Sequence, residues 1–417
     1  MKILHITPHL GGGIGKAHLA IAGALPKGVE QTVLLLEQPR DPRFPDAIAA
    51  AGVRVVTAQG LDDVADLADA ADIVQFEFWN HPRMYECLGR AAFPAMRSVF
   101  WSHISGLTRP IIPQALMEEA GRFVFTTEAS RSIPSIARLS AGSQRKLAVI
   151  NSGFGFADAP PRETSRGGTP AIAYLGTVDF VKMHPGFFEA IDRLDSRDVR
   201  VLIWGAVDPS GPVVDRASAM RHPERIRFCG HTPEPAAALS GAEIFFYPLQ
   251  PDHYGTGENA LIEAMSIGLV PLVLRNSAEM TIVSHGVTGF VARSIDECVA
   301  LLQMLLCSPD VRERISRNAR TAVAETRTPA RSARQFMELW RRLLDEPKRF
   351  PDFRRAVGAG PADWYLATQC LPGQAWEPTR QSAPEPLSKG GLRHFENAFP
   401  GDESLARLRF CGEARPG

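Results

Sequence analysis

Tyr254-Gly-Thr-Gly-Glu-Asn-Ala-Leu-Ile-Glu-Ala-Met-Ser-Ile-Gly-Leu-Val-Pro271 combines a glycine-rich loop, a helix and the turn into a buried strand. Backbone N–H groups at the start of such a helix attract phosphate, and glycines let a diphosphate approach closely. Glu263 lies one or two turns into the helix, where its carboxylate can accept hydrogen bonds from ribose hydroxyls. The alternative is a structural turn, with Glu263 only interacting with the helix dipole. The stretch predicts a nucleotide-sugar site with the candidate binding residues Gly255, Thr256, Gly257, Glu258, Asn259 and Glu263.

Length and composition limit the class of protein. A chain of 417 residues with 45% hydrophobic residues can bury large cores and should hold two or three domains. Lys+Arg and Asp+Glu are equal at 46 each, so no basic field favours nucleic acid as a partner. The cysteines have no CxxC spacing, which argues for reduced thiols and against a disulfide or zinc framework. They are Cys87, Cys229, Cys298, Cys307, Cys370 and Cys411.

The chain shows no targeting or membrane-spanning pattern. Its start, Met1-Lys-Ile-Leu-His-Ile6, is a short apolar strand without the longer apolar region of a signal peptide. No apolar run approaches the length of a transmembrane helix. We therefore expect a cytoplasmic protein.

Short aliphatic runs alternate with helical patterns from the first residue, which predicts doubly wound parallel sheets. Helix-length segments between them include Lys16–Leu25 and Ala129–Leu139. The strands predicted in the first half are Lys2–Thr7, Gln31–Leu36, Val53–Thr57, Asp72–Glu77, Ser98–Ser102, Arg122–Thr126 and Leu147–Asn151.

The second half repeats this organisation after a segment of turn formers, Asp158–Pro170. Three helices follow its last strand, at about Ile295–Leu306, Pro309–Glu325 and Pro329–Leu344. The predicted strands are Ala171–Leu175, Val199–Trp204, Ile226–Cys229, Glu243–Tyr247, Val270–Leu274 and Gly289–Val291. The predicted organisation is a domain over 1–156, a linker over 157–170, a domain over 171–327, a closing helix over 328–345 and a partly ordered extension over 346–417.

The extension mixes proline, glycine and charge with isolated aromatic residues. Trp364, Tyr365, Trp376 and Phe395 suggest partial docking onto the body, whereas Gln381–Pro386 is expected to be flexible.

A second glycine-rich turn, Pro8-His-Leu-Gly-Gly-Gly-Ile-Gly15, follows the first strand and precedes a helix expected to begin near Lys16. Backbone donors of Gly12 and Gly13 together with Lys16 could contact a diphosphate. The spacing is neither G-x-G-x-x-G nor G-x-x-x-x-G-K-[ST], so dinucleotide and P-loop sites lose support. A structural turn is the alternative.

Two further residues stand at the ends of predicted strands, where ligands of such sheets gather. His103 follows the apolar strand Val99–Ser102, and Lys182 follows the first strand of the second domain. Lys182 could neutralise the phosphate of a departing nucleotide. The alternatives are a structural histidine and a solvated surface lysine.

In their order along the chain, these motifs resemble those of the retaining glycosyltransferases of family four over about residues 1–345. The resemblance implies the glycosyltransferase B fold, with two Rossmann-like domains facing across a cleft. It implies transfer of a sugar from a nucleotide donor, held mainly by the second domain, to a hydroxyl acceptor held mainly by the first. The matching segments are Gly12-Gly13, His103, Val149-Ile-Asn-Ser-Gly153, Leu175-Gly176 with Lys182, Ile203-Trp-Gly205, Phe228-Cys-Gly230, and Glu263 through Gly268 and Pro271.

The resemblance also implies roles for single residues. Lys182 and Gly13 would contact the donor diphosphate, Glu263 the ribose hydroxyls, and His103 would lie beside the donor sugar. The predicted catalytic residues are His103, Lys182 and Glu263, and the further predicted donor contacts are Gly12, Gly13, Lys16, Thr177, Gly205, Gly255, Thr256, Gly257, Glu258 and Asn259.

Two positions depart from the family pattern. The family often has arginine after the glycine that matches Gly176, where this chain has Thr177. It commonly has a second glutamate eight positions before the one that matches Glu263, where this chain has Gly255. The Thr256 hydroxyl and Glu258 could supply substitute contacts.

The implied mechanism is front-face displacement without a protein nucleophile, in which the leaving phosphate helps to deprotonate the acceptor hydroxyl. Lys182 and helix N-termini would stabilise the departing diphosphate. No Asp-x-Asp triplet occurs, so we expect neither a metal-bridged diphosphate nor any cofactor besides the donor.

Two other functions remain open from the sequence: a nucleotide-sugar binding protein without transferase activity, and an enzyme of the same fold that epimerises or hydrolyses the nucleotide sugar. A basic cluster near the last helix could contact anionic lipid at the inner face of a membrane. A solvated face is the alternative, because Asp345, Glu346 and Asp352 dilute the charge of Arg341, Arg342, Lys348, Arg349, Arg354 and Arg355.

Overall fold

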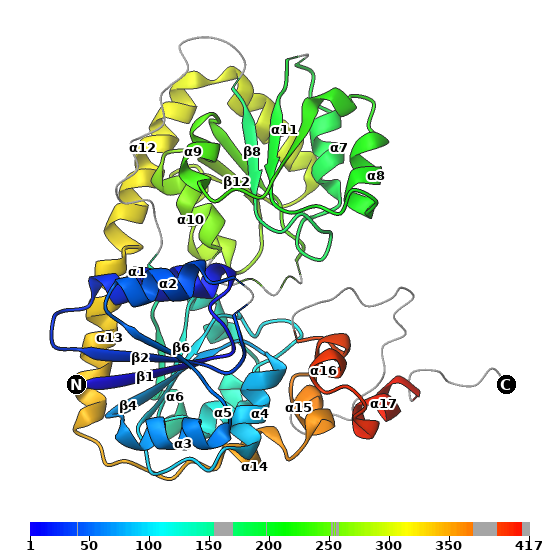
Figure 1. Cartoon of the computed structure of the whole chain (residues 1–417). Helices are drawn as coiled ribbons and strands as arrows, with labels where there is room; N and C mark the ends of the chain where they lie inside the picture. Colours follow the sequence, from blue (N-terminus) through cyan, green and yellow to red (C-terminus); the bar gives the residue numbers. More distant parts are fainter. Residues whose placement is uncertain are drawn as a thin grey trace. The chain divides into compact units, whose positions relative to one another are not determined.

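The computed structural model describes residues 1–39, 41–153, 170–196, 198–251, 253, 255, 258–369 and 390–410, without the side chains of residues 409 and 410. The chain divides into two compact units (Figure 1). The first unit contains Met1–Ser152 and Ser332–Gly417, and the second contains Gly153–Arg331. Residues 157–169 of the predicted linker lie outside the described residues.

The first unit is built on a seven-stranded parallel sheet with the order β3-β2-β1-β4-β5-β6-β7. The central strands β1, β4 and β5 are almost entirely buried, because helices cover both faces of such a sheet. The strands are β1 (Lys2–Thr7), β2 (Glu30–Leu35), β3 (Arg54–Thr57), β4 (Ile73–Phe78), β5 (Ser98–Ser102), β6 (Arg122–Phe125) and β7 (Leu147–Val149).

The second unit has a six-stranded parallel sheet with the order β10-β9-β8-β11-β12-β13. Every predicted strand of both units forms, with ends that differ by at most two residues. The prediction of two doubly wound α/β domains is therefore confirmed. The strands are β8 (Ile172–Leu175), β9 (Val201–Trp204), β10 (Ile226–Gly230), β11 (Ile244–Tyr247), β12 (Val270–Leu274) and β13 (Phe290–Ala292).

One helix prediction in the first unit is wrong. Ala129–Leu139 forms two short 3₁₀ helices, η1 (Glu128–Ser132) and η2 (Ile136–Arg138), instead of one α-helix. Pro134 lies between them, and proline removes a backbone donor and clashes with the preceding turn. The α-helices before β8 are α1 (Gly12–Ala24), α2 (Arg43–Ala50), α3 (Leu61–Ala70), α4 (Pro82–Arg90), α5 (Gln114–Glu119) and α6 (Ala141–Gln144).

The second unit has helices after most of its strands. The long helices α11 and α12 begin and end within one residue of their predicted bounds. The helices are α7 (Gly186–Asp192), α8 (Pro212–Ser218), η3 (Pro223–Arg225), α9 (Pro235–Ser240), α10 (Asn259–Ser266), η4 (Glu279–Thr281), α11 (Ile295–Cys307) and α12 (Pro309–Thr326).

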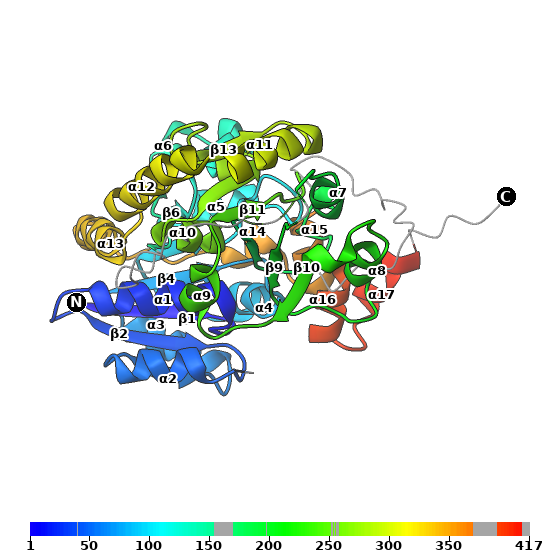
Figure 2. The same ribbon diagram turned by 90° about the horizontal axis from the view of Figure 1, so that it is seen from above.

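The chain returns to the first unit within helix α13 (Pro329–Leu344). This helix is strongly amphipathic, and its buried side includes Phe336, Trp340 and Leu343. The Trp340 Nε1 donates a hydrogen bond to Gln75 Oε1 on β4 at 3.1 Å. The C-terminal helices are α14 (Phe353–Val357), α15 (Pro361–Ala367), α16 (Leu392–Ala398) and α17 (Glu403–Phe410), and the last three lie together in Figures 1 and 2.

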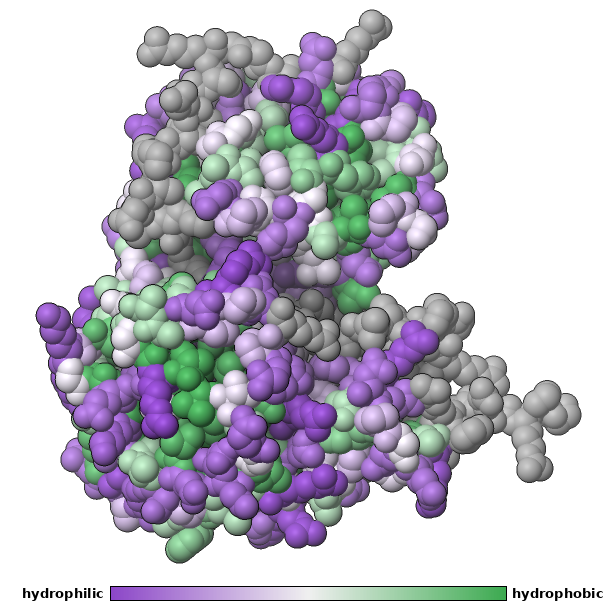
Figure 3. Space-filling view, in the orientation of Figure 1, coloured by the Kyte–Doolittle hydropathy of each residue, from purple (hydrophilic) through white to green (hydrophobic). Residues whose placement is uncertain are grey.

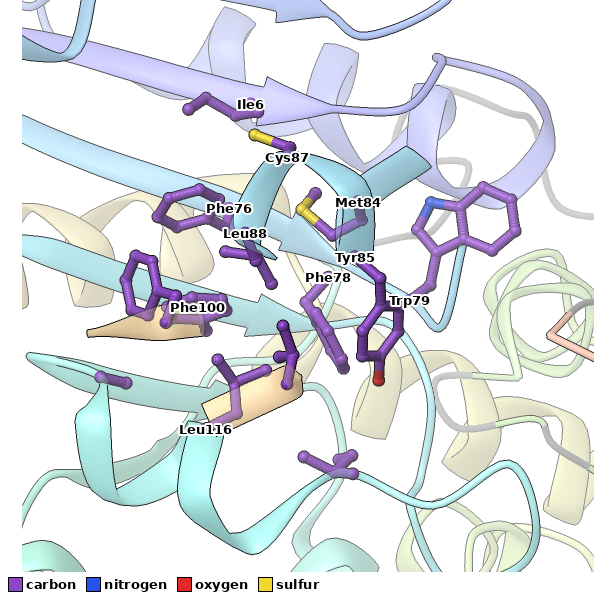
Figure 4. Close-up of a cluster of buried hydrophobic side chains, with 14 of the residues drawn as sticks. Ile6, Phe76, Phe78, Trp79, Met84, Tyr85, Cys87, Leu88, Phe100 and Leu116 are labelled. Atoms are coloured by element: carbon purple, nitrogen blue, oxygen red, sulfur yellow. The ribbon is translucent and has the colours of Figure 1, made fainter. Parts of the chain in front are cut away.

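Aromatic side chains dominate the core of the first unit. Figure 4 shows side chains of α4, among them Met84 and Leu88, beside Phe76, Phe78 and Phe100 of the sheet. Trp364, Tyr365 and Phe395 of the C-terminal extension are buried in the same core, as predicted, whereas Trp376 and Gln381–Pro386 lie outside the described residues. The extension therefore contributes directly to the core of the first unit.

No helix in the described part of the chain is long and apolar enough to cross a membrane. Hydrophilic residues are spread over much of the face shown in Figure 3.

Gly15→Ala is expected to destabilise the first unit, whereas Gly23→Ala in the same helix is not. A β-carbon on Gly15 would lie 2.2 Å from the Leu10 carbonyl oxygen and 2.6 Å from the Phe44 ring, and overpacking of this kind costs about 1–3 kcal/mol. Gly23 has no atom within 4 Å of that position, so alanine should add about 0.5–1 kcal/mol of helix stability. Thermal unfolding measures both, and equal Tm values for the two variants would contradict the packing role of Gly15.

Candidate functional site

The strand ends of the second unit approach one another closely at glycines. Gly176 follows β8 with φ 151°, and Gly205 follows β9 with φ 149°. A β-carbon on Gly205 would lie 2.1 Å from the Gly176 carbonyl oxygen, so a larger residue cannot fit there. The Gly205 N–H donates to the Gly230 carbonyl at 2.9 Å. Gly205, predicted as a donor contact, thus has a clear structural reason to be glycine, and its role in binding stays a prediction.

Lys182 lies in the segment between β8 and α7. Its side chain pairs with Glu258, the residue directly before α10. Its Nζ is 3.0 Å from Glu258 Oε2, which also accepts a hydrogen bond from the Tyr247 hydroxyl at 2.9 Å. Among the described residues, Glu258 is the only non-glycine residue with positive φ (38°). That backbone conformation costs roughly 1–2 kcal/mol. Strained residues are concentrated at binding sites, so the strain at Glu258 favours a binding role for this loop.

The charges of this group are coupled. Burial would raise the pKa of Glu258, but Lys182 and His253 outweigh it, so the pKa of this carboxyl lies below its ordinary value. A lysine near the positive end of a helix dipole is unfavourable without a neighbouring anion. Glu258 provides that anion, and a bound phosphate would provide another.

The Glu258 carboxylate lies against Gly255, the position where the family pattern has a second glutamate. A β-carbon on Gly255 would lie 1.9 Å from Glu258 Oε1. The Glu258 carboxylate therefore reaches the point where a side chain at position 255 would begin. A side chain at position 255 therefore cannot fit while Glu258 keeps this conformation.

Sequence reasoning missed a second polar group beside this pair. His253 Nε2 lies 3.0 Å from Glu279 Oε1, and His253 Nδ1 accepts the Gly255 N–H at 2.9 Å. Asn276 Nδ2 donates to the same Glu279 oxygen at 3.2 Å. Neither residue belongs to a recognisable motif, because the loop and η4 that carry them meet only in the folded unit.

Three buried oxygens in this region, Glu258 Oε1, Asn259 Oδ1 and Glu279 Oε2, have no hydrogen-bond partner among the described residues. Unsatisfied buried acceptors are costly and suit a ligand that brings donors, such as hydroxyl groups. Glu263 is buried further along α10. Thr256 and Gly257 lie outside the described residues, and Thr177 is exposed after β8.

The other predicted residues belong to the first unit. Helix α1 begins at Gly12 and not near Lys16, so Gly12 and Gly13 form its first turn and Lys16 lies in its second. The earlier start is possible because Gly12 adopts φ 59° and the buried Gly15 fits against α2. Both glycines and Lys16 are at least partly exposed.

His103 follows β5 and contacts a buried carboxylate. Its Nε2 lies 2.9 Å from Glu77 Oε2 on β4, while Glu77 Oε1 contacts His5 Nδ1 at 3.0 Å. His18 Nδ1 of α1 lies 3.7 Å from the same oxygen. Glu77 was not predicted. The signal in the sequence was a glutamate inside an otherwise largely apolar strand, and the structure shows that all six residues of this strand are buried.

These groups strongly shift one another's protonation. Burial would raise the pKa of Glu77, but hydrogen bonds from His103 and His5 outweigh it and hold that pKa well below its usual range. Burial and then repulsion by His5 lower the pKa of His18 to about 3. The cluster therefore contains an anionic Glu77 and a neutral His18 at neutral pH.

Two groups of described residues bring three possible metal ligands within 4.8 Å of one another: His5 with His18 and Glu77, and His9 with Glu37 and His81. Metal-bound imidazoles normally donate their second ring N–H to an acceptor. In the second group both Nδ1 atoms instead accept backbone N–H groups, at 3.0 and 3.1 Å. In the first group neither Nε2 atom has an acceptor among the described residues. Neither group therefore shows the second-nitrogen hydrogen bonds that metal-bound imidazoles normally make.

Residues 156–322 match the family model described as Glycosyl transferases group 1. This range covers most of the second unit. No match is found among curated protein sequences.

Solved glycosyltransferase structures share the two-domain B fold. Anabaena HepE in complex with UDP and glucose has a TM-score of 0.67 and 16% identity, covering 82% of this chain and 100% of HepE. A glycosyltransferase from Rickettsia africae has a TM-score of 0.67 and 14% identity, covering 83% and 99%. Sucrose-phosphate synthase from Thermosynechococcus elongatus has a TM-score of 0.64 and 16% identity, covering 83% and 99%. At these identities the likeness shows the fold, and it confirms the predicted glycosyltransferase B fold.

Lys182→Met is expected to destabilise the second unit by about 3–5 kcal/mol, because it leaves the Glu258 carboxylate buried without its cation. Lys182→Met/Glu258→Gln should recover most of this loss, since the neutral amide needs no cation. Hydrogen–deuterium exchange of the α10 and β11 amides measures the effect separately from the first unit. If the single variant exchanges as slowly as the wild type, the ion pair does not stabilise the fold.

The first unit should lose stability as pH falls below 6.5. The folded pKa of His18, about 3, lies below its ordinary value of 6.5, so only the unfolded chain binds this proton between those values. The free energy of unfolding should therefore fall with pH by up to about 1.4 kcal/mol per unit from this group. His18→Asn removes the titrating ring and should flatten the profile between pH 6.5 and pH 4.5. Urea unfolding at several pH values measures this, and equal slopes would refute the assignment.

Proposed function

We propose that the chain is a retaining glycosyltransferase that moves a sugar from a nucleoside-diphosphate donor to a hydroxyl acceptor. The second unit would bind the donor, which the match to the glycosyltransferase group 1 model supports. Uracil is the first base to test, because HepE has been solved with UDP and with UDP-glucose. The acceptor class stays open.

The observation that carries the proposal is the placement of Lys182 at the N-terminus of α10, 3.0 Å from Glu258. A cation and a helix N-terminus are both attractive to phosphate, and together they favour a diphosphate over a neutral ligand. The adjacent unpartnered oxygens of Glu258 and Asn259 favour hydroxyl donors. A nucleotide sugar offers both kinds of group.

The proposed retaining reaction implies the following bonding changes. The bond between the anomeric carbon and the phosphate oxygen breaks, and a bond to the acceptor oxygen forms on the same face. The acceptor proton passes to the leaving phosphate oxygen, and no protein nucleophile or metal takes part. Lys182 and the α10 N–H groups would stabilise the negative charge that develops on the diphosphate. Glu258 would orient the sugar hydroxyls, Glu263 would contact the ribose, and His103 would accept a hydrogen bond from a hydroxyl of the donor sugar that does not react.

A nucleoside diphosphate is expected to raise the Tm of the wild-type chain, and Lys182→Ala and Glu263→Ala should abolish that rise. At a ligand concentration 100-fold above Kd the stabilisation is about 2.7 kcal/mol. Lys27→Ala, which removes an exposed lysine of the first unit, is the matched control and should behave as the wild type. A thermal-shift screen with UDP, GDP, ADP and their sugar conjugates measures this. No shift with any of them would overturn the donor site.

Turnover separates transfer from the two other functions. With the donor found above, Lys182→Ala should reduce the transfer rate about 100-fold, by analogy with the loss of one oxyanion donor. NMR of the product should show the anomeric configuration of the donor, whereas inversion would refute the retaining mechanism. Nucleotide binding without turnover would indicate a binding protein. Turnover that needs no acceptor would indicate an epimerase or hydrolase.

A further inference from the structure

We propose that Glu77 is a positioning residue that holds His103 in the tautomer with its proton on Nε2, so that Nδ1 accepts a hydrogen bond from a substrate hydroxyl. The identity of that hydroxyl rests on the proposed function. The tautomer is a property of the chain alone and can be measured without substrate.

The His103 ring is held from two sides. Its Nε2 lies 2.9 Å from Glu77 Oε2, and its ring centroid lies 4.5 Å from that of Trp101. Its backbone N–H donates to the Phe78 carbonyl at 2.8 Å. Nδ1 has no hydrogen-bond partner among the described residues. The residue follows β5, at the carboxyl ends of the parallel strands, where ligands of parallel α/β folds bind.

Trp340 determines which way the neighbouring amide of Gln75 faces. An indole N–H can only donate, and Trp340 Nε1 lies 3.1 Å from Gln75 Oε1. The Gln75 amide nitrogen must then face Glu77 Oε1, at 3.0 Å. Glu77 Oε1 is therefore an acceptor in this bond, as an ionised carboxylate requires.

The same logic assigns the two histidine bonds. An ionised carboxylate only accepts hydrogen bonds, so each imidazole atom that contacts it is a donor. This places the His5 proton on Nδ1, at 3.0 Å, and the His103 proton on Nε2. His18 Nδ1, at 3.7 Å, is too distant for a hydrogen bond. Three donors thus surround Glu77, two on Oε1 and one on Oε2.

This inventory predicts a specific effect of Glu77→Gln. An amide presents one acceptor oxygen and one NH₂ group, so it can satisfy only one side of the site. Two donors, from His5 and Gln75, occupy one side and His103 alone occupies the other. The amide oxygen should face the two donors, and its NH₂ should face His103 Nε2. His103 would then move its proton to Nδ1 and lose the acceptor offered to the hydroxyl.

Histidine-ring ¹⁵N NMR of the full chain tests the proposal, with His103→Gln used to assign the His103 signals. Wild-type His103 is expected as the neutral Nε2–H tautomer at pH 7.5, and Glu77→Gln should convert it to Nδ1–H. Glu279→Gln, which alters a buried glutamate bonded to His253 in the second unit, is the matched control and should leave His103 unchanged. A wild-type Nδ1–H or doubly protonated ring, or an unchanged tautomer in Glu77→Gln, overturns the proposal.

Activity adds a readout that a purely structural role would not change. Glu77→Gln should lower kcat about tenfold, the equivalent of one hydrogen bond, while UDP binding by thermal shift stays at the wild-type level. If Glu77→Gln does not fold, the wild-type spectrum still decides the tautomer. Glu77→Asp is the second variant: its side chain is one methylene shorter, so its carboxylate lies farther from His103 and the preference for Nε2–H should weaken. Failure of all nucleotide binding would refute the donor site and leave the tautomer result intact.

Discussion

Each unit keeps an ionised carboxylate out of water near the ends of its central strands, and this constraint organises both candidate sites. Removing an anion from water costs several kcal/mol unless donors and cations surround it. Glu77 therefore gathers donors from His5, Gln75 and His103. Glu258 gathers Lys182 and Tyr247. Side chains from separate elements are held in place because each carboxylate needs all of its partners.

The two carboxylates solve the same problem with different chemistry. Glu77 accepts hydrogen bonds from side-chain N–H donors, so its main effect is on the direction of the groups that contact it. Glu258 pairs through one oxygen with a cation beside a helix N-terminus, and such a cation attracts a second anion. The first arrangement suits the orientation of a hydroxyl, and the second suits the binding of a diphosphate.

Distant parts of the chain set the chemistry of the first site. Trp340, on a helix that reaches the first unit only after the second unit is complete, determines how Gln75 faces Glu77. In the second unit, Glu258 takes the space that a side chain at Gly255 would fill. The departure from the family pattern at this position is therefore compatible with a carboxylate at the donor site, at the cost of a strained residue at the start of α10.

The sequence by itself determined the strands and their division between two parallel sheets, because buried parallel strands are continuous apolar runs bounded by turn formers. It also placed Lys182 and His103 after strands and Glu263 within a helix. It was wrong where a local rule competed with another: Pro134 interrupts the helix expected at Ala129–Leu139, and glycines let α1 begin at Gly12. Only the tertiary structure decided the partners of Glu77 and Glu258. Side chains more than 70 positions apart meet through sheet register and helix packing, and no local pattern encodes which of them converge.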